Sequence, residues 1–514
     1  MNAPVPDHVE VELKLAIAGQ DAHRIARLPL IRDSARGRAR TRTMHGIYFD
    51  TPERALQRAR AALRLRREGS QWVQTIKFGG SVEGGLHSRY ESEKRVAGPF
   101  LDRQALAHPA LEPLLNDAGL LDTLVPVFTV QFRRTTRMLS PAPDTSIELC
   151  VDVGEIRTGE RSLPLCEMEL ELKAGSPAAL IDFAQILVEQ VPGRLEPASK
   201  AERGYALALG QAPAPVRARA PVFGTDASLE QVFRAIVFNC VEQLQANERG
   251  VVAGEDPEYL HQARVALRRL RSALATFDTA FPRARYAGLL DELRWLDGCL
   301  GPARDWDVFV SSTLAAVLRA FPADGGLRAL AGHAADLRQD HRRIAVDALS
   351  STRHTRLLLA LTGLFLQRPW QADADSLSVQ ALTPRQFAQQ MLARRHKKVV
   401  KRGRRHAGLD HAGLHALRIE IKKLRYAAEF VAGLYERKAA GAYLDPLARL
   451  QDLLGGLNDA ATVDRLCAEL RARLAGAEGE SVGLLRGWAA ALAEDHLASL
   501  PKAWKRFRDA RPFW

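Results

Sequence analysis

Charged residues alternate with apolar residues in five separate segments of residues 1–175. In the first segment Glu10, Glu12 and Lys14 stand two positions apart, with apolar residues between them. Successive side chains of a β-strand point to opposite faces, so this alternation predicts a strand with one charged face. The other segments are residues 63–66, 89–93, 148–152 and 167–173. One such face is most often the solvated side of an antiparallel sheet, but five together suggest another arrangement.

Both signs of charge occur on these faces, which narrows the chemistry they could perform. Carboxylates in pairs such as Glu10 and Glu12 offer hard oxygen ligands for Mg²⁺ or Mn²⁺. Arginine and lysine donate to phosphate oxygens, and arginine can do so bidentately. An oligophosphate bound through its metal ions needs this mixture. If the apolar faces pack against covering helices, the charged faces must line a wet lumen, so the strands are expected to close into a barrel.

A second charged pattern occurs twice in the C-terminal half, in residues 260–271 and again 154 positions later in residues 414–425. At about 100° per residue, four basic side chains of each copy share one helical face. These residues are His261, Arg264, Arg268 and Arg271 in the first copy, and His415, Arg418, Lys422 and Arg425 in the second. Like charges at this spacing destabilise an isolated helix, which favours an anionic partner over a merely solvated face.

The same offset relates residues 300–305 to residues 454–459. Two matches at one offset predict a duplicated helical region, with repeats at about 225–370 and 380–514. Each repeat is expected to be a small helical bundle, and a pseudo-two-fold relation would bring the two basic helices into one shared surface.

Length and composition indicate the number of domains, the degree of order and the cellular location. A chain of 514 residues is too long for one core, and 46% hydrophobic residues argue against disorder. No long apolar run and no basic-then-apolar N-terminal pattern are present, so a soluble, cytoplasmic protein without a membrane partner is expected. The five cysteines lack paired spacing and are expected to be free thiols.

The net charge of +13 lies almost entirely in the second half of the chain. Residues 1–210 hold 28 basic and 27 acidic residues, a difference of +1, whereas residues 211–514 hold 45 and 33, a difference of +12. Residues 376–409 alone contain nine basic residues and no acidic one. Such a field attracts phosphate polymers. With only 6% aromatic residues for base stacking, nucleic acid is not the expected partner.

A segment rich in proline and alanine, residues 211–224, is predicted to be a semi-rigid linker between two domains. Strand signals precede it and helical spacing follows it. The predicted fold class is therefore α+β: an antiparallel β tunnel barrel with covering helices in residues 1–210, followed by an all-α domain of two pseudo-symmetric bundles in residues 225–514.

With these motifs in place, residues 8–205 resemble a CYTH domain of the triphosphate tunnel metalloenzyme superfamily. The signature is Glu10-x-Glu12-x-Lys14, and the further matches in chain order are residues 48–51, 62–66, Lys77, residues 167–173 and residues 199–200. Residues 225–514 resemble a CHAD domain in residues 261–271, 303–307, 415–425 and 512–514. The combination is similar to bacterial CYTH–CHAD inorganic triphosphatases.

The resemblance implies roles for individual residues. Divalent metal, Mg²⁺ or Mn²⁺, would be held by Glu10, Glu12, Asp152, Glu169 and Glu171, although Glu167 shares the face of the last two. Triphosphate would be held by the catalytic cations Lys14, Arg64, Arg66, Lys77, Arg134 and Lys200. Arg134 fits the family spacing, whereas strict alternation from Gln131 would favour Arg133. Inorganic polyphosphate would bind His261, Arg264, Arg268, Arg271, His415, Arg418, Lys422 and Arg425.

The leading hypothesis is thus metal-dependent hydrolysis of inorganic triphosphate in the tunnel, with a polyphosphate-binding helical domain. A class IV adenylyl cyclase and a thiamine triphosphatase are alternative uses of the same tunnel. A non-catalytic protein that binds polyphosphate or associates with polyphosphate granules is a further alternative. The glycine-rich residues 79–85 lack the Lys-Ser/Thr of a P-loop and are expected to form a flexible hairpin loop at the tunnel mouth. The sequence does not predict the oligomeric state.

Overall fold

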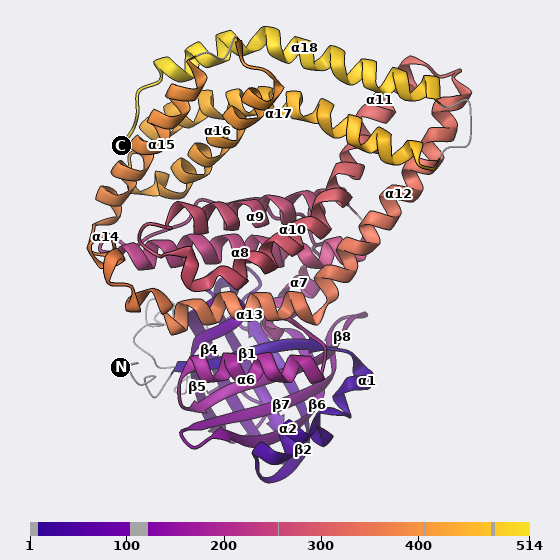
Figure 1. Cartoon of the computed structure of the whole chain (residues 1–514). Coiled ribbons are helices and arrows are strands. Elements are labelled where there is room, and N and C mark those ends of the chain that lie inside the picture. The colour runs from indigo at the N-terminus through magenta and orange to yellow at the C-terminus, as the bar shows by residue number, and fades with distance from the viewer. Residues whose placement is uncertain (1–8, 103–121, 255, 405–407, 474–478) are drawn as a thin grey trace. The chain divides into compact units, whose positions relative to one another are not determined.

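The computed structural model describes residues 9–102, 122–254, 256–404, 408–473 and 479–514. The chain divides into two compact units (Figure 1). The strand unit contains Met1–Pro213 together with Ser350–Gln367, and the helical unit contains Ala214–Leu349 and Arg368–Trp514. Among the described residues, no helix has both the length and the apolar character needed to cross a bilayer.

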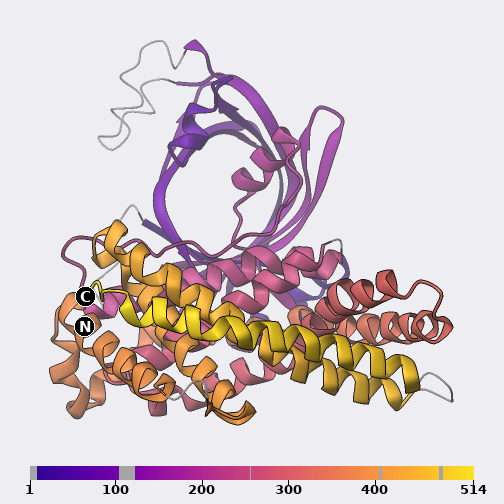
Figure 2. The same ribbon diagram turned by 90° about the horizontal axis from the view of Figure 1, so that it is seen from above.

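Within the described residues of the strand unit, eight antiparallel strands close into a ring (Figure 2). The order around the ring is β5-β4-β3-β2-β6-β7-β8-β1, and β1 pairs with β5 to close it. The strands are β1 (Val9–Ile17), β2 (Ala35–Asp50), β3 (Ala61–Glu68), β4 (Gln71–Glu83), β5 (Leu86–Val96), β6 (Val125–Ala142), β7 (Thr145–Thr158) and β8 (Arg161–Ala174). The short β9 (Gly193–Leu195) adds to β1. The predicted tunnel barrel is confirmed.

The alternation of the sequence decides which face of the ring is inside. On β1 the odd-numbered Leu13 and Leu15 point outward and are fully buried, whereas Glu12 and Lys14 point into the lumen. The outer face is covered by short helices α1 (Gly19–Ala22) and α2 (Pro29–Ser34) and by α6 (Pro177–Gln190), which packs on β8. Covering helices therefore replace solvent on the apolar side, as the alternation predicted.

Helix α7 (Lys200–Leu209) fills one end of the lumen. A capping box of Ser199 and Glu202 fixes its first turn. Tyr205 packs edge-on against Phe128 of β6 and donates a hydrogen bond of 2.9 Å to Asp50 at the end of β2. This end of the ring is apolar inside, and the charged lumen begins beyond it.

One helix beyond residue 225 belongs to the strand unit. Helix α13 (Thr352–Gln367) packs on α6, where Gly363 lies against Ile181. The hydroxyl of Thr355 donates a hydrogen bond of 2.7 Å to the carbonyl of Gly193 in β9. These residues lie within the first predicted helical repeat, and in the structure their apolar face completes the cover of α6.

The glycine-rich residues 79–85 form a hairpin, but they do not form the expected flexible loop. Gly84 and Gly85 are a buried two-residue turn between β4 and β5, and a side chain on Gly85 would meet Leu195. Gly80 adopts a φ of +84° at a β-bulge, where a Cβ atom would lie 1.9 Å from the Ser88 carbonyl oxygen. Packing on both sides therefore holds this segment in place.

The helical unit is all-α in its described residues. Its longer helices are α8 (Leu229–Ala253), α9 (Pro257–Thr276), α10 (Ala287–Val308), α12 (Gly325–Ser350), α15 (Pro384–Gly403), α16 (His411–Val431), α17 (Arg437–Arg471) and α18 (Gly479–Asp509). Asp256 caps α9 and Asp410 caps α16, so the two basic helices begin 154 residues apart, at the offset of the sequence repeat. Arg405, in the basic run before α16, lies outside the described residues.

The predicted linker, residues 211–224, contains no helix or strand. Its middle is nevertheless held against α8, because the side chain of Asn247 makes hydrogen bonds of 3.0 and 2.9 Å with the backbone of Val216. Arg269 also donates to the carbonyl of Arg219 at 3.3 Å. These contacts attach the second half of the linker to the helical unit.

Candidate functional site

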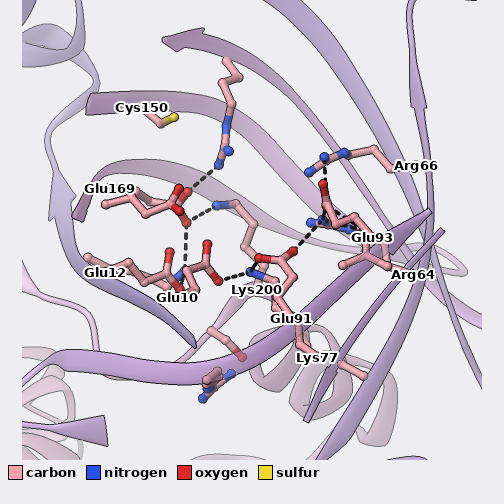
Figure 3. Close-up of a pocket in the computed structure, with 18 of the residues that line it drawn as sticks. Glu10, Glu12, Arg64, Arg66, Lys77, Glu91, Glu93, Cys150, Glu169 and Lys200 are labelled. Atoms are coloured by element: carbon pink, nitrogen blue, oxygen red, sulfur yellow. Dashed lines mark hydrogen bonds and ion pairs between the residues drawn. The ribbon is translucent and has the colours of Figure 1, made fainter. Parts of the chain in front are cut away.

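The lumen of the strand unit contains a cavity of about 210 Å³ with a highly charged lining. Side chains from strands on different sides of the ring point toward one another in it (Figure 3). Its cations are Lys14, Arg64, Arg66, Lys77, Arg89, Arg134, Lys173 and Lys200, and its carboxylates are Glu10, Glu12, Glu91, Glu93, Glu148, Glu169 and Glu171. Charges of both signs are therefore held at close range inside the protein.

Lys200 is the centre of the deepest group. Its Nζ lies 2.8 Å from Asp152 Oδ2 and 2.8 Å from Glu169 Oε1, and it also contacts Glu167. Burial alone would lower the pKa of Lys200, but Asp152, Glu167 and Glu169 raise it above its ordinary value. The ammonium group is therefore permanently charged.

Asp152, Glu167 and Glu169 bring their oxygen atoms within 4.8 Å of one another, which is close enough for a metal ion. Their partners argue for another role. Besides Lys200, Glu167 contacts Arg203, and it lies behind the cavity rather than on its lining. Burial would raise the pKa of Glu169, but Lys14, Lys200 and Arg134 hold it well below its ordinary value. These carboxylates are thus already compensated by cations of the protein.

Arg134 connects this group to the open cavity. Its guanidinium binds Asp152 bidentately, with Nε–Oδ1 and Nη2–Oδ2 distances of 2.8 and 2.7 Å, and it also contacts Glu169. The neighbouring Arg133 is exposed on the outer face of β6. Alternation from Gln131 favoured Arg133 only if the polar Gln131 faced the lumen. In the structure the apolar Phe128, Val130 and Phe132 face the lumen near α7, so Arg134 shares the inner face. The family spacing identified the lining arginine correctly.

A second group of ion pairs lies across the cavity. Lys77 Nζ is 2.6 Å from Glu10 Oε2 and 3.0 Å from Glu91 Oε2. Burial would lower the pKa of Lys77, but these carboxylates and Glu12 raise it. Lys14 Nζ lies 2.7 Å from Glu12 Oε1 and 2.9 Å from Glu169 Oε1. The signature residues of β1 therefore bridge both groups.

Arg64 and Arg66 share one carboxylate. Glu93 Oε1 lies 3.4 Å from Arg64 Nη2 and 3.2 Å from Arg66 Nη2, and it accepts a hydrogen bond of 2.9 Å from Thr75. The Nε atoms of both arginines are buried without a hydrogen-bond partner. Arg66 also contacts Glu68, but the free Nε donors of both arginines leave room for an anionic ligand.

Glu171 has a raised pKa although it makes an ion pair with Lys173. Burial, followed by the neighbouring Glu10, raises its pKa to about 7, although Lys173 opposes the shift. Burial and the neighbouring Glu10 both disfavour the charged form of Glu171, and a bound cation would favour it. The donor set around Glu171, with Glu10, Glu12 and Glu148, therefore suits a hard divalent cation.

The structure brings together all but one of the predicted tunnel residues on a single cavity lining. The exception is Asp152, which is fully buried behind Arg134. Sequence reasoning gave no role to Glu91, Glu93 and Glu148, although all three lie in segments recognised as alternating. Each of them stands an even number of positions from other charged residues of its segment, and this spacing could have identified them as inward-facing.

In the helical unit, α9 and α16 pack against each other, so the two basic faces meet as the repeat predicted. Arg268, Arg418 and Lys422 form the centre of a basic cluster, in which burial and then Arg268 of α9 lower the pKa of both Arg418 and Lys422 of α16. Among the described residues, these three make no ion pair with a carboxylate, and the Nε atoms of Arg268 and Arg418 are buried without a partner. Burial, then Arg268 and Arg418, lower the pKa of Lys422 to about 7.

The flanking predicted residues are more fully compensated. Arg264 donates to the carbonyl of Gly301 at 2.7 Å and lies 3.0 Å from Asp305. Arg271 pairs with Asp297, and Arg425 binds Glu429 on its own helix at 2.7 Å. His261 is half-buried, and burial followed by Arg304 lowers its pKa. His415 is exposed near the start of α16.

Comparison with known proteins finds one family model in each half of the chain. A family model described as the CYTH domain matches residues 8–205, and one described as the CHAD domain matches residues 235–468. A protein of Haemophilus influenzae described as "Inorganic triphosphatase" is 32% identical over 203 residues, which is 38% of this chain and 54% of that protein. The matched part of the chain thus spans about half the length of this relative.

Two further relatives cover more of the chain. An uncharacterized protein of Mycobacterium tuberculosis is 27% identical over 505 residues, 92% of each chain. The crystal structure of the CHAD domain from the plant Ricinus communis is 37% identical, with a TM-score of 0.52, and covers 59% of this chain and 99% of that one. The chain therefore belongs to the CHAD family, and its residues 8–205 match the CYTH family model.

Proposed function

We propose that the protein hydrolyses inorganic triphosphate in the tunnel, with the help of a divalent metal ion. The observation that carries the proposal is the lumen itself, where eight cations and seven carboxylates surround one cavity. Such a lining matches a substrate that carries several negative charges and arrives with metal ions. The 32% identity to an inorganic triphosphatase over 203 residues supports this choice of substrate.

The cations of the lining would bind the phosphate groups. Lys14, Arg64, Arg66, Lys77, Arg134 and Lys200 already have carboxylate partners at hydrogen-bond distance, which fixes their side chains before substrate binds. Groups that are held in place need little reorganisation as charge develops. In a loose phosphoryl-transfer transition state the charge spreads over the oxygens of the transferred group, and these donors would stabilise it there.

The metal ion would be held by Glu10, Glu12 and Glu171, with Asp152 and Glu169 behind them. The raised pKa of Glu171 supports this location, because a cation there would compensate its charge. The ion, Mg²⁺ or Mn²⁺, would offset the charge of the phosphate oxygens and help to activate the attacking water. Asp152 and Glu169 would act chiefly by positioning Arg134 and Lys200, to which they are bound.

We further propose that the helical unit binds inorganic polyphosphate at the cluster of Arg268, Arg418 and Lys422. Three adjacent cations with no carboxylate partner among the described residues are costly to the free protein, and an anion would relieve that cost. Arg264, Arg271, Arg425, His261 and His415 would flank the bound chain. A polymer longer than the cluster could also localise the protein to polyphosphate granules.

Phosphate release from triphosphate, ATP, thiamine triphosphate and long-chain polyphosphate, with Mg²⁺ or Mn²⁺, tests the tunnel proposal. Release from triphosphate far above that from ATP and thiamine triphosphate is expected, with no cyclic AMP formed. The variant E10Q/E12Q should lose turnover, whereas E53Q/E160Q, which removes two exposed carboxylates, should keep it. Turnover that survives E10Q/E12Q would refute the metal assignment. Polyphosphate binding without any turnover would favour a binding protein.

The polyphosphate proposal is tested by the binding affinity for long chains at several salt concentrations. R268Q/R418Q/K422Q should weaken binding and reduce its salt dependence. The control R319Q/R437Q/K502Q removes the same number and types of charge from exposed positions of the same unit. Equal losses in the two variants would mean that net charge, and not the cluster, accounts for binding.

A further inference from the structure

A row of arginines on β2 lies outside the lining of the tunnel cavity. Between Arg24 and Arg42 the chain carries seven arginines and a single carboxylate, Asp33. Four of these arginines, Arg36, Arg38, Arg40 and Arg42, fall within β2, and all four are exposed. The strand unit as a whole is almost neutral up to residue 210, so this concentration of positive charge is local.

The pairing of β2 with β6 places three of the four arginines on the lumen side of the ring. Arg42 stands opposite Arg134, and Arg40 stands opposite Thr136. Directly opposed residues of an antiparallel pair share a face, and Arg134 lines the cavity. Arg36, opposite Met138, has the same phase on the far side of a β-bulge that contains Gly37 at a φ of +70°. Three of the arginines therefore continue the charged inner face.

The row lies at the end of the lumen opposite α7. Toward α7 the inner face of β2 continues through Met44 to Tyr48, which packs with Phe128 and Tyr205. Pairing of β2 with β3 stops at Met44, so within the described part of the chain the segment that bears the arginines pairs with β6 alone. At roughly 3.3 Å per residue the row extends on the order of 15–20 Å outward from Arg42.

The arginines of the row have fewer carboxylate partners than the cations of the cavity. Among the described residues, Arg36, Arg38 and Arg40 make no ion pair. The nearest partner of Arg42 is Glu68, at 3.8 Å, and that carboxylate also contacts Arg66. Arg42 in addition faces Arg134 directly, and like charges in that position are unfavourable. An anion that enters along the lumen axis would compensate the row and then reach the cavity cations.

We propose that this row, Arg36, Arg38, Arg40 and Arg42, is an anion-binding subsite for the outer units of a linear polyphosphate whose end occupies the tunnel. This inference rests on the proposed function and extends its substrate class to chains longer than triphosphate. In the reaction, the oxygen of water bonds to the terminal phosphorus and the bridging P–O bond breaks. The bridging oxygen leaves with the shortened chain, and orthophosphate and a proton are released.

The test uses the full chain with R268Q/R418Q/K422Q as background, so that binding by the helical cluster does not contribute. In that background R36Q/R38Q/R40Q is compared with R58Q/R67Q/R133Q, three exposed arginines away from the lumen. We measure kcat/KM for triphosphate and for long linear polyphosphate by phosphate release, at low and high salt. Thermal denaturation of each variant shows that the fold is retained.

In R36Q/R38Q/R40Q, kcat/KM for long chains should fall about tenfold or more, and this kcat/KM should become less dependent on salt concentration. Its kcat/KM on triphosphate should change by less than about threefold, and the control variant should match the background on both substrates. An equal loss of kcat/KM on both substrates would overturn the inference. The inference would also be overturned if the R268Q/R418Q/K422Q background, with the row intact, hydrolysed triphosphate but not long chains.

Failure of the proposed function gives a different result, since the unmutated protein would then hydrolyse neither substrate. In that case long-chain binding to the same background decides the inference. The subsite is supported if R36Q/R38Q/R40Q binds long chains more weakly than the background and R58Q/R67Q/R133Q binds them equally well. Equal binding by the background and both variants overturns it. Competition by single-stranded DNA as strong as that by polyphosphate would reassign the row to nucleic acid.

Discussion

Lys422 allows a quantitative test of the basic cluster between α9 and α16. Burial, Arg268 and Arg418 lower its pKa from 10.5 to about 7, so much of the free protein lacks this charge just above neutral pH. Phosphate groups in the cluster would favour the charged form and return the pKa toward its ordinary value. Binding of polyphosphate should therefore be coupled to proton uptake by Lys422.

The size of the effect follows from the pKa. At pH 8, about a tenth of the free molecules carry the proton and nearly all bound molecules do, so binding should take up about 0.9 proton. Between pH 7 and pH 9 the protonated fraction of free Lys422 falls about 50-fold, and the affinity should fall by up to that factor. Stability of the free protein should rise over pH 7–10, because there the unfolded chain binds more protons at this residue.

The assay is isothermal titration calorimetry at pH 8 in two buffers that differ in ionisation enthalpy. Long chains are used because their internal phosphates do not titrate in this range. K422M should abolish most of the proton uptake, whereas K423M, on the exposed neighbouring position, should retain it. Equal apparent enthalpies in the two buffers for the unmutated protein would refute the reasoning, as would undiminished uptake by K422M.

Three further outcomes test the strand unit. R134A removes a bidentate partner of the fully buried Asp152, so the free energy of unfolding measured with denaturant should fall by about 3 kcal/mol and turnover should be lost. A fall in the free energy of unfolding of less than about 1 kcal/mol would contradict the role of this pair. G204A would place a Cβ atom 2.1 Å from the ring of Phe128, and its melting temperature should fall with a destabilisation of about 1–3 kcal/mol; an unchanged melting temperature would show that α7 can shift. A fragment of residues 1–213 lacks α13 and exposes the outer face of α6, so it should melt lower than the strand unit does in the full chain; equal melting would show that this cover is dispensable.

Much of the tunnel could be predicted from local pattern. A period of two with charge on one phase requires a strand with a charged face, and Glu10, Glu12 and Lys14 lie on that face in the structure. The basic faces of the two helices could likewise be predicted, since their spacing and their offset of 154 residues are properties of the sequence. At these positions, assignments from the phase of one element were reliable.

Assignments that depend on neighbouring elements were not. The inner face of β6 is apolar from Phe128 to Phe132 because α7 enters that end of the lumen, so alternation alone selected the wrong arginine next to Arg134. Residues 352–367 have the apolar pattern of a buried helical face, but only the structure shows that this face packs on α6. A hydrophobic pattern states that a face is buried and does not state against what.

By itself, the sequence determined the strand ring, the all-α half, the duplication and the set of charged residues that could meet phosphate. Only the tertiary structure decided how those charges are paired: Lys200 and Arg134 compensate Asp152 and Glu169, whereas Glu171 in the tunnel and Arg268, Arg418 and Lys422 in the helical unit remain under-compensated. The reason is physical. Periodicity fixes the direction of a side chain relative to its own element, but Coulomb interaction and desolvation depend on distances between elements remote in sequence.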